Sequence, residues 1–105
     1  MLEIYAVTIG FPSSETYGLI DQLKRAAYSV PSNIVEGQSR NSTKDYLRFL
    51  YNSRGSLEEV RYFLLLSFDL KFIPDKEYKR LEELCEAASK MLNGLIKSLK
   101  SKDQN

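Results

Sequence analysis

The chain has 105 residues, of which 43% are hydrophobic and 28% charged, and this composition fits one soluble globular domain. It contains no His and a single Cys, which excludes imidazole-based catalysis, an internal disulfide and a multi-cysteine metal site. Fifteen Lys and Arg balance fourteen Asp and Glu, so no excess of positive charge marks the whole chain as a nucleic-acid binder.

The sequence shows no signal for export or membrane insertion. No apolar run approaches the roughly 18–20 residues that cross a bilayer, and the N-terminus lacks the basic start and cleavage site of a signal peptide. We therefore expect a cytoplasmic protein with no membrane contact, no cofactor, no metal and no small-molecule substrate. No acid, base and nucleophile occur at a recognisable spacing, so we also expect no enzymatic activity.

Two segments near the N-terminus predict helix. Residues 2–9 are too few to form a stable helix alone, and we interpret them as the last turn or two of one. Ser13 or Ser14 is predicted to cap a second helix, Pro31 to kink it without ending it, and Gly37 to end it. The apolar residues of this second helix recur at three- and four-residue steps, at Ile20, Leu23, Ala27, Val30 and Ile34.

The helical pattern resumes at Thr43 and continues to about Lys71. Ser42 is a good N-cap, and Asp45 stands three residues later in an acidic variant of the capping box. Gly55 costs about 1 kcal/mol inside a helix, which favours a close approach of another helix at that point. The main apolar stripe consists of Leu47, Leu50, Leu57, Val60, Leu64 and Phe68.

The end of this long helix, residues 62–73, is apolar on nearly every side. One partner face cannot bury such a segment, and a domain of this size has little room for a central helix. We therefore predict that chains associate through it, with Phe63, Leu66 and Leu70 in the interface between subunits.

A further long helix is predicted from Lys76 to about Lys100, followed by a polar tail over residues 101–105. Its apolar stripe consists of Tyr78, Leu81, Cys85, Ala88, Leu92, Leu95 and Leu99. The place of Cys85 on this stripe indicates a buried structural thiol. No strand-like alternation appears, so the sequence predicts an all-α fold with one domain, residues 1–100, built from three substantial helices and a short N-terminal one.

A set of residues spread over about residues 5–99 is typical of a known family. Its members are Tyr5, Thr8, Phe11-Pro12, Glu15, Tyr17-Gly18-Leu19, Gln22, Arg25-Ala26-Ala27, Ser29, Pro31, Asn33-Ile34, Glu36-Gly37, Arg40, Phe49-Leu50, Gly55-Ser56-Leu57, Glu58-Glu59 and Met91-Leu92-Asn93-Gly94-Leu95-Ile96. In these residues the sequence resembles the four-helix bundle proteins encoded in intervening sequences of bacterial large-subunit ribosomal RNA genes.

The resemblance implies an antiparallel up-and-down four-helix bundle that assembles as a ring-like homopentamer. The family is also similar to the accessory protein of diversity-generating retroelements, which engages a reverse transcriptase and nucleic acid. Two features depart from the family pattern. The first helix is truncated to residues 1–9. The family usually has two arginines before Ala-Ala, and here Lys24 replaces the first of them. A Lys can still contact a phosphate as a single charge, but it cannot make the two parallel hydrogen bonds of an Arg.

The candidate nucleic-acid-binding site consists of basic residues. Arg40, Lys44 and Arg48 step four residues apart near the start of a helix, where cations oppose the helix dipole, so helix stability does not explain them. With Lys24, Arg25 and Arg54 they form the candidate nucleic-acid-binding set. The competing interpretation is a solvated charged face, and Tyr46 and Tyr51 are assigned to the core or an interface rather than to base stacking.

Asn33, Glu36 and Arg40 share a helical face. They are interpreted as a local ion pair, Glu36 with Arg40, plus a cap by Asn33, with a recognition patch as the alternative.

Two functions follow from these observations. The preferred one is a non-enzymatic homo-oligomer that binds RNA, DNA or a nucleoprotein through its basic residues. The alternative is a structural or adaptor homo-oligomer that binds a protein partner and has no nucleic-acid role, which the nearly balanced net charge favours.

Overall fold

The computed structural model describes residues 2–15 and 18–103, and the regular secondary structure in this part of the chain is all helical, as predicted. A short helix, α1 (Leu2–Val7), leads into two 3-10 turns, η1 (Thr8–Gly10) and η2 (Ser13–Glu15). Three long helices follow: α2 (Leu19–Gln38), α3 (Thr43–Asp69) and α4 (Asp75–Asp103). The all-α class and the short first helix are confirmed.

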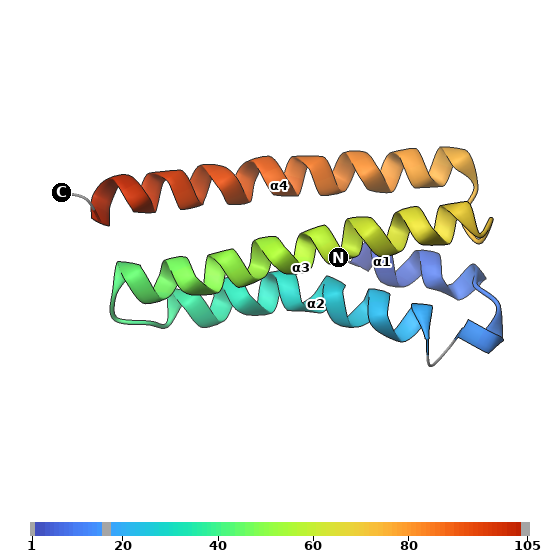
Figure 1. The fold of residues 1–105 in the computed structure, drawn as a ribbon, viewed down its shortest axis with the longest axis horizontal. Coiled ribbons are helices and arrows are strands. Elements are labelled where there is room, and N and C mark those ends of the chain that lie inside the picture. Colours follow the sequence, from blue (N-terminus) through green and yellow to red (C-terminus); the bar gives the residue numbers. More distant parts are fainter. Residues whose placement is uncertain (1, 16–17, 104–105) are drawn as a thin grey trace.

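The long helices run antiparallel in an elongated bundle of 50 × 25 × 17 Å, with α3 between α2 and α4 (Figure 1). The expectation that a domain of this size has little room for a central helix is therefore wrong. Because α3 packs against α2 on one side and α4 on the other, much of its apolar surface is buried within the chain.

The start of α2 differs from the prediction. Ser13 and Ser14 lie in the separate turn η2, and α2 begins four residues later at Leu19, after Gly18, without a side-chain cap. Pro12 precedes η2, so the chain turns a second time before the long helix starts. Pro31 does not end α2, which continues through it to Gln38 as predicted.

Two serines of α3 pack against α2 around this proline. The Ser53 hydroxyl donates to the Val30 carbonyl at 2.8 Å, and the Ser29 and Ser56 hydroxyls lie 2.8 Å apart. Ser53 is fully buried. Small side chains let two helices approach closely, and their hydroxyls supply hydrogen bonds for buried polar groups. These serines therefore join α2 to α3 next to Pro31, which has no amide hydrogen of its own to donate.

Neither Gly37 nor Gly55 has the role predicted for it. A Cβ on Gly37 would lie 2.8 Å from Cδ1 of Tyr46 and 3.0 Å from Cβ of Phe49, so Gly37 serves the close approach of α2 and α3 rather than the end of α2. A Cβ on Gly55 would meet nothing within 4 Å, which contradicts the predicted helix approach there. Gly55 lies on the outer face of α3.

The predicted cap of α3 is confirmed, because the Ser42 hydroxyl accepts a hydrogen bond from the Asp45 amide at 3.1 Å. Helix α4 extends three residues beyond the predicted end, so residues 101–103 are helical rather than part of a tail, and residues 104–105 lie outside the described residues. Within the part of the chain that is described, none of the helices combines the length and apolar character needed to span a bilayer.

The core consists of two clusters placed one after the other along the bundle. The larger one joins α1, α2, α3 and α4 at the end where α1 lies, and it includes Leu23, Leu57, Leu64 and Leu81. The smaller one lies where the α2–α3 turn meets the end of α4, and it consists of Leu47, Leu50, Leu92 and Ile96. The predicted α3 stripe is buried in these clusters except for Phe68, which is half-buried and stacks on the ring of Tyr78.

Candidate nucleic-acid interface

The fold gathers the basic residues at one end of the bundle. Because the helices are antiparallel, residues 33–54 and 90–102 share the half that contains the α2–α3 turn. This half, called here the basic end, carries eight Lys and Arg against two Asp and Glu. Its cations are Arg40, Lys44, Arg48, Arg54, Lys90, Lys97, Lys100 and Lys102.

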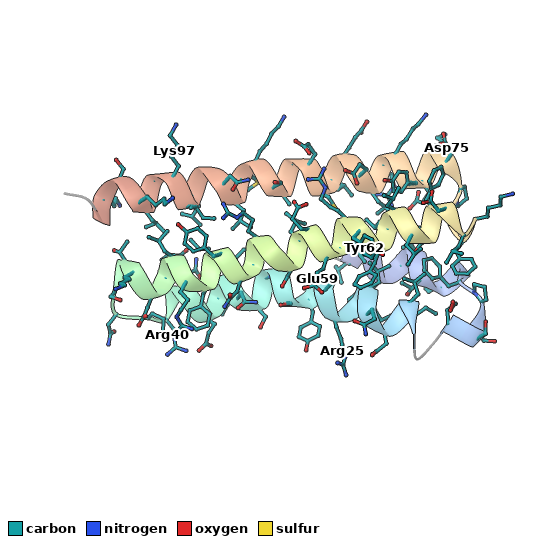
Figure 2. The ribbon with its side chains drawn as sticks, in the orientation of Figure 1. Arg25, Arg40, Glu59, Tyr62, Asp75 and Lys97 are labelled. Carbon is teal, nitrogen blue, oxygen red and sulfur yellow. The ribbon has the colours of Figure 1, made fainter. Side chains whose placement is uncertain are left out.

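The other described residues carry seven Lys and Arg against twelve Asp and Glu. Figure 2 shows the separation: Arg40 and Lys97 lie toward one end of the bundle and Asp75 at the other. The near-zero net charge of the chain therefore conceals a basic end and an acidic end, and only the first provides the local positive field that attracts a polyanion.

Two arginines of the basic end contact one aromatic ring. The guanidinium carbons of Arg40 and Arg48 lie 4.7 and 4.5 Å from the centroid of the Phe49 ring. Arg40 also pairs with Glu36, as predicted, and Arg48 lies 4.0 Å from Asp45. The ring thus holds two guanidinium groups near the surface by cation–π attraction.

A second aromatic ring connects α3 with α4. The Arg54 guanidinium lies 5.0 Å and the Lys100 ammonium 5.8 Å from the centroid of Tyr51, and Arg54 donates to the Asn93 side chain at 3.2 Å. Tyr51 is 36% exposed, so the assignment of this residue to the core is wrong. Tyr46 is half-buried against the smaller core cluster, in agreement with its assignment.

A shallow hollow of about 380 Å³ lies beside Tyr51 on the outer face of α3. Lys44, Arg48 and Asn52 line it together with Leu47 and Asp45. Among the described residues, Lys44 has no ion-pair partner within 4.0 Å, so its charge is free to meet an anion.

The structure brings together four of the six predicted cations and leaves two elsewhere. Arg40, Lys44, Arg48 and Arg54 belong to the basic end. Lys24 and Arg25 lie outside it on α2, where Lys24 is 5.6 Å from the centroid of the Tyr5 ring and Arg25 pairs with Asp21 at 3.2 Å.

Asn33 does not cap α2. Its side-chain amide donates to the carbonyl and hydroxyl of Ser29, at 2.8 and 3.0 Å, one turn back along the helix. The end of α2 is instead bonded by Ser39, whose hydroxyl donates to the Glu36 carbonyl at 2.7 Å.

The three residues predicted at a subunit interface differ in burial. Phe63 and Leu66 are half-buried and pack against the larger core cluster of their own chain. Leu70 is 48% exposed, and the neighbouring Tyr62 and Leu65 are 61% and 45% exposed. The outer face of α3 near the acidic end therefore retains exposed apolar side chains.

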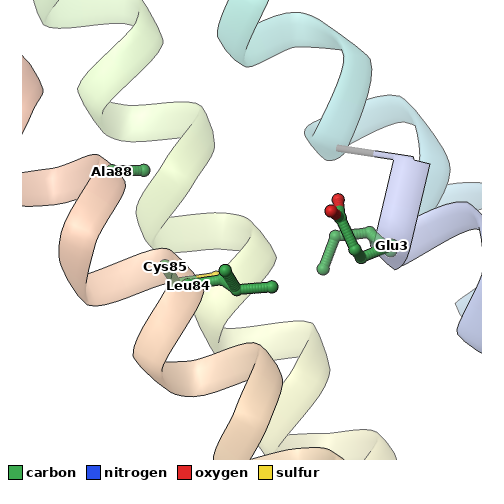
Figure 3. Close-up of a pocket in the computed structure, with 5 residues that line it drawn as sticks. Glu3, Leu84, Cys85 and Ala88 are labelled. Carbon is green, nitrogen blue, oxygen red and sulfur yellow. The ribbon is translucent and has the colours of Figure 1, made fainter.

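Cys85 is buried, as predicted. Its side chain lines a small cavity of about 170 Å³ between α4 and α1, with Glu3 on the opposite side (Figure 3). Burial, and to a smaller extent the charge of Glu82, raises the pKa of the thiol from 9.0 to about 11. Such a thiol stays protonated at neutral pH and is a poor nucleophile.

The acidic end contains its own network. Arg61 of α3 donates to Glu82 of α4 at 2.7 and 3.2 Å and lies within 3.1 Å of Glu86, and its pKa is raised mainly by the hydrogen bonds to Glu82. These charged hydrogen bonds join α3 to α4.

Sequence reasoning did not include Phe49 or Lys100 among the candidate site residues, and of the two places it offered for Tyr51, the core and an interface, the structure excludes the core. The sequence places Arg48 next to Phe49 and Arg54 three residues after Tyr51. The second cation at each ring cannot be found in this way, because Arg40 lies before α3 and Lys100 lies in α4. An aromatic residue flanked by cations on an amphipathic helix was the available signal.

Three comparisons with known proteins concern the family and the fold of the chain. The model of the 23S rRNA-intervening sequence protein family matches residues 1–94. No curated protein sequence matches the chain. A solved structure from Bacteroides thetaiotaomicron VPI-5482, described as a protein with unknown function from the S23 ribosomal protein family, aligns with a TM-score of 0.80 and 21% sequence identity, over 91% of this chain and 87% of that chain. At this identity the likeness shows a common fold.

Proposed function

The chain belongs to the 23S rRNA-intervening sequence protein family, and from this premise we propose that it is a cytoplasmic, non-enzymatic homo-oligomer that binds nucleic acid or a nucleoprotein through its basic end. The observation that carries the proposal is the charge separation along the bundle, with eight cations against two acids at that end. Lys and Arg side chains grouped in this way release condensed counterions from a phosphate backbone, which supplies most sequence-independent affinity.

Assembly supports the same function. The exposed apolar side chains of Tyr62, Leu65 and Leu70 give copies of the chain a surface through which to associate. A ring of five copies pointing in one direction, which the family resemblance implies, places every basic end on one rim. Several weak phosphate contacts on one rim act together and raise the overall affinity by avidity.

The salt dependence of binding tests the nucleic-acid role. Binding of a fluorescently labelled RNA is measured at 50–200 mM salt for the wild type and for the triple variant Arg40→Gln, Lys44→Gln, Arg48→Gln. We expect the wild type to bind more weakly as salt rises, and the triple variant to lower the slope of log affinity against log salt by roughly 2–3, about 0.7–0.9 for each lost contact.

A matched triple variant at the acidic end, Lys71→Gln, Lys76→Gln, Lys79→Gln, removes the same charge from the chain and is the control. Equal losses in both triple variants, or RNA binding that does not respond to salt, would overturn the proposed interface.

The subunit association has its own test. Leu70→Asp places a charge on an exposed side chain, so it is expected to reduce the native mass measured by light scattering without reducing helicity. Phe63→Asp and Leu66→Asp are less clean because both residues pack in the core of their own chain. A wild type that remains monomeric at high micromolar concentration contradicts the homo-oligomer.

One observation favours the alternative, an adaptor without a nucleic-acid role. A groove of about 320 Å³ between α2 and α4 is lined by apolar side chains, among them Val30, Ile34 and Leu95, and Met91 at its edge is 77% exposed. Such a groove suits an apolar helix face of a protein partner. A single protein retained on the immobilised chain after nuclease treatment, and lost in Met91→Asp, supports the adaptor.

A further inference from the structure

We propose that the hollow beside Tyr51 on the outer face of α3 accepts one unpaired nucleotide, with the Tyr51 ring as the stacking surface for its base. The inference rests on the proposed function and names the class of nucleic acid, a single strand. It assigns a binding role to Tyr51 and Asn52, which lie outside the predicted cation set.

The hollow combines the groups that a nucleotide needs. Lys44 and Arg48 line it with two cations for a phosphate, against the one carboxylate of Asp45, which lies 4.0 Å from Arg48. Tyr51, 36% exposed, adds an aromatic ring, and Asn52 adds an exposed amide. An amide both donates and accepts hydrogen bonds, as the polar edges of bases do. The volume of about 380 Å³ lies in the range of small-molecule sites.

The ring of Tyr51 is held in place before any ligand arrives. Arg54 of α3 and Lys100 of α4 both lie within 6 Å of its centroid, at 5.0 and 5.8 Å. Arg54 is itself held by its hydrogen bond to Asn93. A ring restrained from two helices loses little side-chain freedom on binding, which favours stacking over an unrestrained surface tyrosine.

The stacking ring selects single strands. In a duplex each base face is covered by its neighbours in the stack, so a protein ring gains access to an unpaired base only. Stacking on an aromatic side chain is tolerant of base identity because every base has a π face. The cations of the basic end, by contrast, attract single strands and duplexes alike.

The test compares Tyr51→Leu with Tyr28→Leu. Tyr28 lies on α2, outside both the basic end and the exposed apolar face of α3, and is 55% exposed, so it is a matched control for the loss of a surface tyrosine. Fluorescence anisotropy is recorded with four labelled probes: a 12-nucleotide uridine strand, a thymidine strand and an abasic strand of the same length, and a blunt RNA duplex.

Tyr51→Leu is expected to weaken binding of the uridine and thymidine strands by about tenfold, and Tyr51→Phe to restore it, because the base face is the contact. Binding of the abasic strand and the duplex should change less than twofold. Tyr28→Leu should leave all four affinities unchanged, and circular dichroism should show the same helicity for every variant.

Two results overturn the inference. Unchanged strand binding in Tyr51→Leu removes the stacking role, and an equal loss on strand, abasic strand and duplex shows that the variant disturbs the cations instead. If the triple variant Arg40→Gln, Lys44→Gln, Arg48→Gln no longer binds the strands but Tyr51→Leu still does, the proposed function stands and only the nucleotide site fails. Absence of binding to all four probes overturns both.

Discussion

Replacement of Gly37 by Ala tests whether α2 and α3 approach as closely as the structure shows. In most helix positions this change stabilises a protein by up to about 1 kcal/mol, because Ala has the higher helix propensity. At Gly37 the added Cβ would lie 2.8 Å from Tyr46 and 3.0 Å from Cβ of Phe49. The Tyr46 ring can rotate, but a Cβ moves only with its backbone.

Overpacking of this kind costs typically 1–3 kcal/mol. Gly37 lies one residue before the end of α2, where the propensity gain is smaller, so we expect Gly37→Ala to lower the free energy of unfolding by about 1–2 kcal/mol. Gly55→Ala and Gly94→Ala are the controls, because a Cβ at either position meets nothing within 4 Å. Each control is expected to gain about 0.5–1 kcal/mol.

The assay is urea unfolding followed by circular dichroism at 222 nm, at one protein concentration because association shifts the apparent stability. For a domain of this size a change of 1 kcal/mol moves the melting temperature by roughly 4–8 °C. A Gly37→Ala variant as stable as the wild type, measured beside a stabilised Gly55→Ala, would refute the close approach of the two helices.

The remaining predictions concern the contacts that join the helices. Arg61→Gln should lower the free energy of unfolding by about 1–2 kcal/mol, since it breaks charged hydrogen bonds to α4, whereas Arg80→Gln, whose hydrogen-bonded partner Glu77 lies on the exposed face of the same helix, should cost clearly less in the same urea assay. Ser53→Ala should cost about 1 kcal/mol because it removes the buried hydrogen bond to α2, and Ser53→Val should cost more by adding bulk there. The pKa of Cys85 is about 11 in the folded chain against 9.0 when exposed, so unfolding releases a proton between these values. The free energy of unfolding of the wild type should fall as pH rises from 9 to 11, and this thiol-dependent part of the fall should be missing in Cys85→Ala; an identical pH dependence in both would show that the thiol is not buried.

Much of the fold could be predicted because the long helices are amphipathic. The apolar stripe of α3 and the Ser42 cap depend only on residues close in sequence, and both are found in the structure. The role of a glycine depends instead on what lies opposite it. Gly37 faces α3 and Gly55 faces outward, and their sequence surroundings alone do not show which helix is near.

The candidate site could be predicted only in part for a similar reason. The row Arg40, Lys44 and Arg48 is visible because its members are four residues apart. The contribution of Lys100 is not visible in this way, because it comes from a segment about fifty residues away that antiparallel packing returns to the same end. Predicting which cations gather at one end of the bundle therefore requires the order and direction of the helices as well as the positions of the charges in the sequence.

The division of the core into two clusters has a consequence for motion. The smaller cluster, Leu47, Leu50, Leu92 and Ile96, supports the basic end, while the larger one supports the end with α1. Opening a segment costs less where fewer apolar side chains are buried, so amide hydrogens in the first turns of α3 and the last turns of α4 should exchange faster with solvent than those beside Leu64. The half proposed to bind nucleic acid is then the more adaptable half, and the half with the larger core is the more rigid one.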